Sequence, residues 1–351
     1  MKFQSEQEKF GLSGVSRLII GSTLTSLMIS ASAFAIDDSG ISSLQAMELP
    51  NLGLSLDNLS VSGISSGAYM AVQLGSLRSD IFTGVGVVAG GPFNCAKGSS
   101  MRAQGCMSAP QNVSVPGLQA DLAKMVSEGS AKSSVGLKYQ TVAIIQGNLD
   151  HVVNPISADK LTEFYNAAGS KVVAKTDLPM GHGFPAPRGE VPCQEGRAPW
   201  INNCGYDGAG FLLQNLMNLP ANSNIAPIDE NLFTFDQADF SPLEAKMAAT
   251  GYVYIPSACQ KGSGNKNCRL HVALHGCMQS PWIVGKNFVK NAGYNDWAES
   301  NNVVVLYPSM MPSMMNPMSC WDWFGYTGSN YATLEGVQVK AILAMVDQLT
   351  K

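Results

Sequence analysis

The five residues Gly63-Ile64-Ser65-Ser66-Gly67 constrain the fold more than any other part of the sequence. They follow a short, partly apolar run at 59–62 and precede apolar residues at helical spacing over 68–77. A glycine two positions to either side of Ser65 suits a tight turn from a strand into a helix, with the serine hydroxyl held clear of the backbone. Glycine and serine are common in turns, so the pattern alone is weak. Its place between a strand and a helix favours a nucleophile elbow centred on Ser65, because Ser66 lacks the two flanking glycines.

Strand-like and helical patterns alternate along the rest of the chain. Strands are predicted at 59–62, 82–89, 141–146, 171–175, 251–256, 269–275 and 302–308, and helices at 68–77, 119–128, 158–168, 208–217, 293–300 and 334–349. Loops are predicted at 93–115 and 178–187, a Pro/Cys-rich excursion at 186–204, and a long surface connection at 218–245. This alternation predicts an α/β fold with a mostly parallel sheet and helices on both of its faces.

The composition of the chain limits its partners and its domain count. With 351 residues and 45% hydrophobic content, it has enough apolar material for one large core, and we expect a single catalytic domain over 36–351 without a separate substrate-binding domain. Only 14% of the residues are charged and the formal net charge is −4. A nucleic-acid partner is therefore not expected, because no basic footprint is present.

The N-terminal 35 residues have the pattern of a signal peptide. Lys2, Lys9 and Arg17 precede a mostly apolar run over 18–29, and Ala33-Phe34-Ala35 forms a small-x-small cleavage site. The run contains polar residues and is shorter than the about 20 apolar residues that a membrane span requires. We therefore expect cleavage and secretion, to the extracellular space or the periplasm, without stable membrane insertion.

The eight cysteines all follow the predicted signal peptide. An even number in an exported chain favours four disulfides, and the C-x₂-C spacing of a zinc site does not occur, so no metal is expected. Eight cysteines allow about 105 connectivities. Short separations favour three pairs and leave a fourth, although other connectivities stay open: Cys95 with Cys106, Cys193 with Cys204, Cys259 with Cys268, and Cys277 with Cys320.

A nucleophilic serine needs a general base, and the sequence offers four histidines. His271 and His275 lie on one predicted strand, where a hydrogen-bonded structural role is more common. His151 directly follows an aspartate at a strand end and is expected to be a neighbour of the site. His182 lies between two glycines in a loop after a predicted strand, from which an imidazole can reach the elbow, so it is the predicted base.

The remaining parts of an acyl-transfer site are also present in the sequence. Asp150 follows a predicted strand and lies between Ser65 and His182 in the chain, as the order Ser, Asp, His requires; a turn or capping role is the alternative. The amide after the nucleophile, that of Ser66, is one predicted oxyanion donor. A second donor normally comes from a loop with a His-Gly motif, which is found here at His275-Gly276.

The His-Gly motif lies far after the serine in this sequence. In most hydrolases that have a nucleophile elbow, this motif comes before the serine. The simplest explanation is a circular permutation, with the old termini joined through 187–245 and new termini opened between the helix at 334–349 and the strand before the elbow. The strands that normally open this fold would then come late, at 251–256, 269–275 and 302–308. A Cys277–Cys320 disulfide would connect the loop that contains His275-Gly276-Cys277, here called the oxyanion loop, to the segment 321–324.

With these features in this order, the sequence resembles the single-domain extracellular poly(3-hydroxybutyrate) (PHB) depolymerases, a family with a circularly permuted α/β-hydrolase fold. The motifs that carry the resemblance are Gly63-Ile64-Ser65-Ser66-Gly67-Ala68-Tyr69-Met70, Gln146-Gly147 through Asp150, Gly181-His182-Gly183, Leu274-His275-Gly276-Cys277 with Gln279, and Cys320-Trp321-Asp322-Trp323. The resemblance implies a triad of Ser65, Asp150 and His182 and an oxyanion hole from the Ser66 and Cys277 amides. It also implies that Trp321 or Trp323 lies beside the scissile ester.

The sequence therefore predicts a monomeric, secreted serine esterase that hydrolyses PHB or related short-chain polyester, and its oligomers, without a metal or cofactor. One alternative is a feruloyl or acetyl esterase acting on plant cell-wall polysaccharide. Another is a noncatalytic binding protein on a hydrolase scaffold, which is disfavoured because elbow, base, acid and oxyanion motif occur together. The methionine-rich run over 310–318 is a candidate for adsorption to polymer, with core packing as the alternative.

Overall fold

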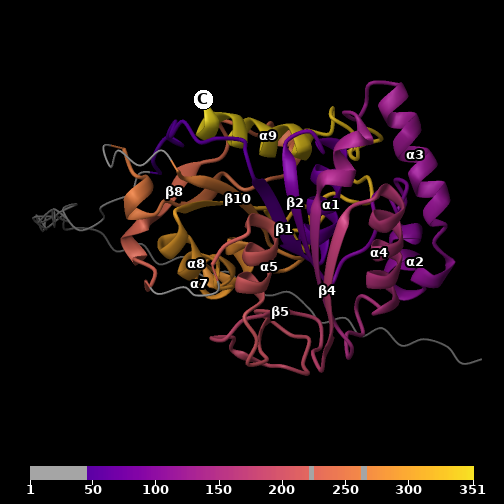
Figure 1. Cartoon of the computed structure of the whole chain (residues 1–351), viewed down its shortest axis with the longest axis horizontal. Coiled ribbons are helices and arrows are strands. Elements are labelled where there is room, and N and C mark those ends of the chain that lie inside the picture. Colours follow the sequence, from indigo (N-terminus) through magenta and orange to yellow (C-terminus); the bar gives the residue numbers. More distant parts are fainter. Residues whose placement is uncertain (1–45, 221–224, 262–266) are drawn as a thin grey trace, which may run out of the picture. The chain divides into compact units, whose positions relative to one another are not determined.

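A sheet of eight strands runs through the centre of the fold, in the order β4-β3-β2-β1-β10-β11-β9-β8 (Figure 1). This computed structural model describes residues 46–220, 225–261 and 267–351. The first six strands in this order, β4-β3-β2-β1-β10-β11, are parallel to one another, whereas β9 is antiparallel to both β11 and β8. The bounds are β1 Leu59–Ile64, β2 Phe82–Val88, β3 Thr141–Gly147, β4 Lys171–Leu178, β8 Leu232–Asp236, β9 Thr250–Tyr254, β10 Arg269–Leu274 and β11 Val303–Tyr307.

Each face of the sheet is covered by its own hydrophobic core. In β11, Val304 and Leu306 face one core, while Val303, Val305 and Tyr307 face the other, as the two-residue period of a strand requires. The first core includes residues of α1 Ser66–Leu77, α3 Val115–Ser127, α4 Ile156–Ala168 and α9 Val337–Thr350. The second includes residues of α5 Gly208–Met217, α7 Asn287–Asn291 and α8 Tyr294–Asn301 (Figure 1). Burial on both faces explains why β3 and β11 are nearly continuous apolar runs.

The strand order has the permuted arrangement predicted from the sequence. Strands β8 to β11 come late in the chain, yet β10 pairs directly with β1, in the middle of the sheet. The segment that leads into β1 lies against the end of α9, because the amides of Leu52 and Leu54 both donate to the Leu349 carbonyl, at 3.3 and 3.2 Å. The last helix is thus hydrogen-bonded to the segment that precedes the strand carrying the elbow.

The predicted loop at 93–115 was wrong in part, because it contains a helix, α2 (Ser100–Ser108). This helix is hard to recognise in the sequence, since it has Gly105 in its interior and buries only Ala103 and Cys106. The Ser99 hydroxyl caps its first turn by accepting from the Arg102 amide, and the Cys95–Cys106 disulfide ties it to the loop after β2.

The long surface connection predicted at 218–245 was also wrong in part. It contains β8, which pairs antiparallel with β9 at the edge of the sheet. The excursion at 186–204 contributes to a small second sheet of the order β5-β7-β6, from β5 Phe184–Pro185, β6 Val191–Pro192 and β7 Ile201–Asn203. These strands are too short to give a periodic pattern.

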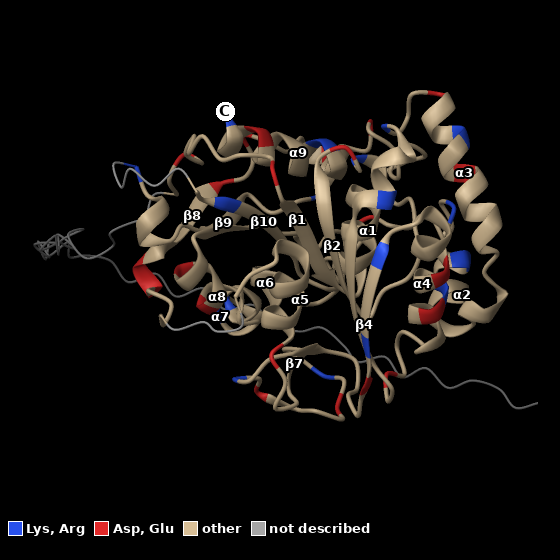
Figure 2. Ribbon diagram, in the orientation of Figure 1, with Lys and Arg blue, Asp and Glu red and all other residues tan. Residues whose placement is uncertain are grey.

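All eight cysteines form disulfides. They are the three pairs that sequence proximity favoured and the fourth that these leave: Cys95–Cys106, Cys193–Cys204, Cys259–Cys268 and Cys277–Cys320. The predicted signal peptide at 1–35 lies outside the described residues. Among the residues that are described, no helix has the length and apolar character to cross a membrane. Lysine and arginine residues are interleaved with aspartate and glutamate over the described part of the chain (Figure 2).

Candidate active site

Ser65 stands at the sharp turn between β1 and α1. Its backbone has φ 56° and ψ −123°, a left-handed conformation that is costly for a residue with a side chain. The flanking glycines make the turn possible, because a Cβ on Gly63 would lie 2.4 Å from the carbonyl carbon of Gly67, and a Cβ on Gly67 would lie 2.4 Å from the carbonyl oxygen of His275. The glycine pattern in the sequence is thus explained by close backbone contacts on both sides of the serine.

Asp150 and His182 form a buried hydrogen-bonded pair. The His182 Nδ1–H donates to Asp150 Oδ2 at 2.8 Å, since a carboxylate can only accept. The other oxygen, Oδ1, accepts from the amides of Val152 and Val153 at 2.8 and 2.9 Å, and Gln146 Nε2 lies 3.4 Å from Oδ2. These contacts fix the ring with Nε2 available to take a proton.

The parallel sheet brings Ser65, Asp150 and His182 to one edge. They follow β1, β3 and β4, and the carboxyl ends of parallel strands lie on the same side of a sheet. All three are buried, with exposed fractions of 8, 4 and 8%. Within the described residues Ser65 and His182 are not hydrogen-bonded to each other; in free enzymes such contacts are often long and tighten when substrate binds.

The small sheet frames the loop that carries His182. The Gly181 amide donates to the Cys193 carbonyl, and the Phe184 amide donates to the Trp200 carbonyl, both at 2.9 Å. The loop is therefore held on both sides of the histidine. The Pro/Cys-rich excursion at 186–204 therefore holds the loop that carries His182, a role that its sequence did not indicate.

The two histidines of β10 and its C-terminal end are structural. His271 is fully buried between the hydroxyls of Ser60 and Ser62, at 2.6 and 2.8 Å, and burial lowers its pKa to about 3. His275 donates from Nδ1 to the Gly276 carbonyl at 2.7 Å and accepts at Nε2 from the Met310 amide at 3.0 Å. Burial lowers its pKa to about 4, so it is neutral over the range in which esterases work. His151 is exposed, one residue after Asp150.

The amides of Ser66 and Cys277 are both available to a ligand. Ser66 is the first residue of α1, where amides have no partner within the helix, and in the described part of the chain neither amide has a protein acceptor. The oxyanion loop is held on both sides of Cys277, because the Gly276 amide donates to Gln279 Oε1 at 2.8 Å and the Met278 amide donates to the Met318 carbonyl at 2.6 Å. Two fixed donors of this kind can stabilise an oxyanion.

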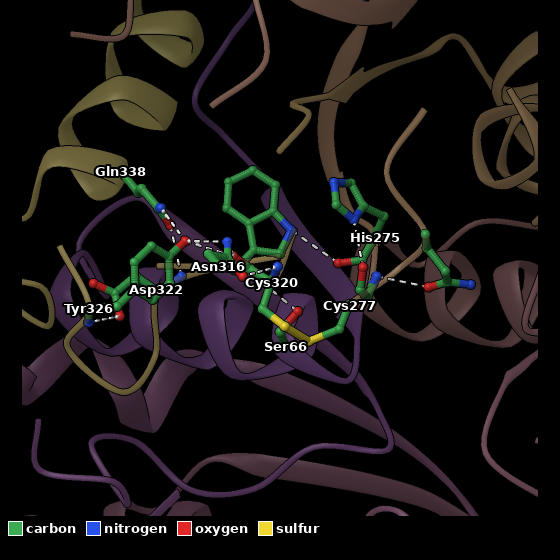
Figure 3. The surroundings of a disulfide bond; sticks show 11 residues. Ser66, His275, Cys277, Asn316, Cys320, Asp322, Tyr326 and Gln338 are labelled. Atoms are coloured by element: carbon green, nitrogen blue, oxygen red, sulfur yellow. Dashed lines mark hydrogen bonds between the residues drawn. A yellow bond between two sulfur atoms is a disulfide. The ribbon is translucent and has the colours of Figure 1, made fainter. Parts of the chain in front are cut away.

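The Cys277–Cys320 disulfide joins the oxyanion loop to the segment that contains both tryptophans (Figure 3). The next residue, Trp321, is fully buried. Its amide donates to Ser66 Oγ at 3.3 Å and its indole N–H donates to the His275 carbonyl at 3.0 Å. Trp321 therefore braces the elbow and the oxyanion loop from inside and has no surface for substrate.

Trp323, in contrast, lines a cavity of about 200 Å³ that opens at Ser65. Its ring stacks on Tyr69, with 3.9 Å between ring centroids and 10° between planes. The cavity is also lined by Ser66 and Cys277, whose amides are the predicted oxyanion donors. Of the two tryptophans indicated by the sequence, Trp323 lines the cavity that Ser65 also lines, and Trp321 does not.

Sequence reasoning missed the role of Asp322, which lies between these tryptophans. Its buried carboxylate accepts from the amides of Phe324, Gly325, Tyr326 and Thr327 and from the Thr327 hydroxyl, at 2.5–3.3 Å. Its own amide donates to Gln338 Oε1 at 2.8 Å. An aspartate before a Gly-containing turn is the sequence signal for such an arrangement. These bonds fold the turn that presents Trp323.

The fold, the strained serine and the paired aspartate and histidine define a serine hydrolase with an α/β-hydrolase fold. A polyhydroxybutyrate depolymerase from Talaromyces funiculosus is 36% identical over 331 residues, which cover 88% of this chain and 94% of that protein. A poly(3-hydroxybutyrate) depolymerase from Delftia acidovorans is 40% identical over 317 residues, or 89% of this chain, and the chain spans 63% of that relative's length. The chain belongs to the poly(3-hydroxybutyrate) depolymerase family.

Solved structures agree with this assignment. The PHB depolymerase from Penicillium funiculosum matches with a TM-score of 0.76 and 34% identity, over 87% of this chain and 99% of that one. A serine-to-alanine variant of a PHB depolymerase, complexed with an R3HB trimer, gives a TM-score of 0.77 with the same identity and coverage. No family model matches the sequence. The predicted fold class is thus confirmed.

The described residues 46–220, 225–261 and 267–351 contain no group of three or more His, Cys, Asp or Glu side chains placed to hold a metal ion.

Proposed function

We propose that the chain is a secreted esterase that hydrolyses the ester bonds of poly(3-hydroxybutyrate) and related short-chain polyesters, releasing hydroxyacid monomers and oligomers. The observation that carries the proposal is the buried Asp150–His182 pair at the same sheet edge as the elbow serine, in a chain whose relatives are PHB depolymerases. We further propose that it acts as a monomer, after removal of the N-terminal signal peptide. Four disulfides suit an oxidising compartment.

In the proposed reaction Ser65 Oγ bonds to the ester carbonyl carbon while His182 Nε2 takes its proton. Asp150 keeps the proton on Nδ1 and stabilises the imidazolium that forms. The negative oxygen of the tetrahedral intermediate would be held by the amides of Ser66 and Cys277. The bond to the leaving oxygen then breaks and His182 returns the proton to it. Water attacks the acyl-enzyme by the same proton transfers, releasing the hydroxyacid and restoring the serine.

We propose that the methionine-rich segment at 310–318 contributes to adsorption on polymer. Met310 is fully buried and belongs to the core, whereas Met311, Met314, Met315 and Met318 are exposed by 39, 98, 69 and 50%. Met315 and Met318 also line the cavity at the nucleophile, so this exposed apolar segment continues into the site. Flexible thioether side chains adapt to irregular surfaces, as a solid polymer presents.

The proposed function is tested with a PHB film and with methyl ferulate. Wild-type protein should clear the film and release hydroxybutyrate products, with little activity on the ferulate ester, and the Ser65→Ala variant should lose both film clearance and labelling by an organophosphate. A preference for methyl ferulate would show that the substrate is a cell-wall ester and not a polyester. Film clearance by Ser65→Ala would show that another group is the nucleophile.

A further inference from the structure

The cavity at Ser65 is bounded by the nucleophile but not by the predicted base. It is lined by Ser65, by the predicted oxyanion donors Ser66 and Cys277, and by Trp323, but His182 does not line it. An ester carbonyl placed on the serine, with its oxygen at the two amides, has two substituents, the acyl carbon chain and the leaving oxygen. One of them must enter this cavity and the other must lie elsewhere.

The position of the base decides between them. The leaving oxygen must receive its proton from His182, so the alcohol part of the ester lies on the histidine side. We infer that the cavity is the acyl pocket and that α2, through Ala103 and Met107, sets the length of acyl group that it accepts. The inference rests on the proposed ester hydrolysis and adds the assignment of the two sides and the residues that limit one of them.

Helix α2 presents one face to this pocket. Ser100, Ala103, Gln104 and Met107 all line it, and their spacing places them on the same side of the helix. Ala103 is only 4% exposed and has the smallest side chain in the wall of the cavity. Met315, Pro317 and Phe324, from a segment far from α2 in the sequence, also line the cavity. A larger residue at position 103 would therefore take space that the substrate needs.

The helix cannot easily withdraw to make room. The Cys95–Cys106 disulfide ties it to the loop after β2. The Met107 carbonyl accepts from the Asn154 amide at 2.8 Å, and the Cys106 carbonyl accepts from the Ser157 hydroxyl at 3.4 Å, both in the segment that follows Asp150. These three bonds hold the last turn of α2 in place, so the size of the pocket should respond to the size of the side chains that line it.

Two substitutions change the pocket in opposite directions. Ala103→Leu should shorten it and lower the hydrolysis of butyryl relative to acetyl esters by about 10-fold or more, because each methylene in a shaped apolar pocket changes kcat/KM by about 10- to 200-fold. Met107→Ala should lengthen it and raise the hydrolysis of hexanoyl relative to acetyl esters by about 10-fold. The matched control is Met101→Leu, on the same helix with its side chain 83% exposed and outside the cavity lining.

The test uses two series of soluble esters with each full-length variant. The first varies the acyl chain from acetyl to hexanoyl on a common p-nitrophenol, and the second varies the alcohol from methyl to hexyl on a common acetyl group. We expect Ala103→Leu and Met107→Ala to change the ranking in the acyl series only, and Met101→Leu to change neither. Altered ranking in the alcohol series would overturn the assignment of sides, and an equal loss on all esters would overturn the role of α2.

The outcome separates this inference from the proposed function. If the wild-type protein hydrolyses the p-nitrophenyl esters but does not clear a PHB film, the polymer substrate is wrong while the acyl pocket is still decided by the variants. If Ala103→Leu fails to fold, as its circular dichroism and melting curve would show, Met107→Ala decides alone, because it removes atoms and adds none. An unchanged hexanoyl to acetyl ratio in that variant would then reject the inference.

Discussion

Removal of the Cys277–Cys320 disulfide, by Cys277→Ala with Cys320→Ala, should separate the stability of the fold from the order of its oxyanion loop. Both backbone amides remain, so any loss of rate reports their position and not their absence. The disulfide closes 43 residues, for which loop-closure entropy predicts a destabilisation of about 4 kcal/mol. Deleting an oxyanion donor outright costs about 10²- to 10³-fold in kcat, so a loosened donor should cost about 10- to 100-fold.

The matched control is the double variant Cys259→Ala with Cys268→Ala. This disulfide lies before β10, whereas Cys277 lies after it, so the two pairs flank the same strand. Its separation of 9 predicts a smaller destabilisation, of about 2.6 kcal/mol. It lies at the opposite end of β10 from the oxyanion loop, and we therefore expect kcat to stay at the wild-type value.

The assay combines urea unfolding with the steady-state hydrolysis of a soluble p-nitrophenyl ester, at a temperature where both variants are folded. The expected result is loss of stability in both variants and loss of kcat only in the first. Full kcat without the Cys277–Cys320 bond would refute the view that it orders the oxyanion loop. An equal loss of kcat in both variants would show that the rate follows general stability.

Three further outcomes are expected. Asp150→Asn should lower kcat by about 10⁴-fold with little change in circular dichroism, because an amide no longer fixes the histidine tautomer; a loss below tenfold would contradict this role. Trp323→Ala should raise KM for hydroxybutyrate oligomers more than for an acetyl ester, since it removes the ring stacked on Tyr69 at the cavity; equal effects on both would argue against substrate contact. Burial lowers the pKa of His271 to about 3 and of His275 to about 4, from 6.5, so the unfolded chain binds more protons below pH 6.5. The free energy of unfolding should fall as the pH drops from 6.5 towards 4, and a flat pH profile in urea titrations would contradict this.

The parts of the structure that are periodic were predictable from the sequence. The buried strand at 302–308 and the strand and helix around Ser65 give strong patterns, and the structure places β11 and α1 there. The chain order of the elbow and the His-Gly motif was enough to predict the permutation, because loops must meet at one edge of a parallel sheet. Short cysteine separations favoured the disulfide pairs that the structure contains.

What the sequence could not give depends on contacts made by single side chains. Helix α2 has little apolar periodicity and is held by a cap and a disulfide, so it was predicted as a loop. Trp321 and Trp323 are two residues apart and chemically identical, and only the packing of one on His275 and the other on Tyr69 distinguishes them. The carboxylate of Asp322 organises its turn through five donors; an aspartate before a glycine indicates a turn, but not that this turn presents Trp323.

The hydrogen bonds from Leu52 and Leu54 to Leu349 have a practical consequence for immobilising the protein. They place the end of α9 beside the segment that leads into the amino end of β1, whereas Ser65 follows the carboxyl end of that strand. A strand of this length spans about 20 Å. Figure 1 accordingly shows the C-terminus and β5, which follows the His182 loop, on opposite sides. A bead, sensor chip or display anchor coupled through Lys351 would hold the molecule by the side opposite the catalytic edge. The catalytic edge would then face away from the support and be accessible to a polymer film.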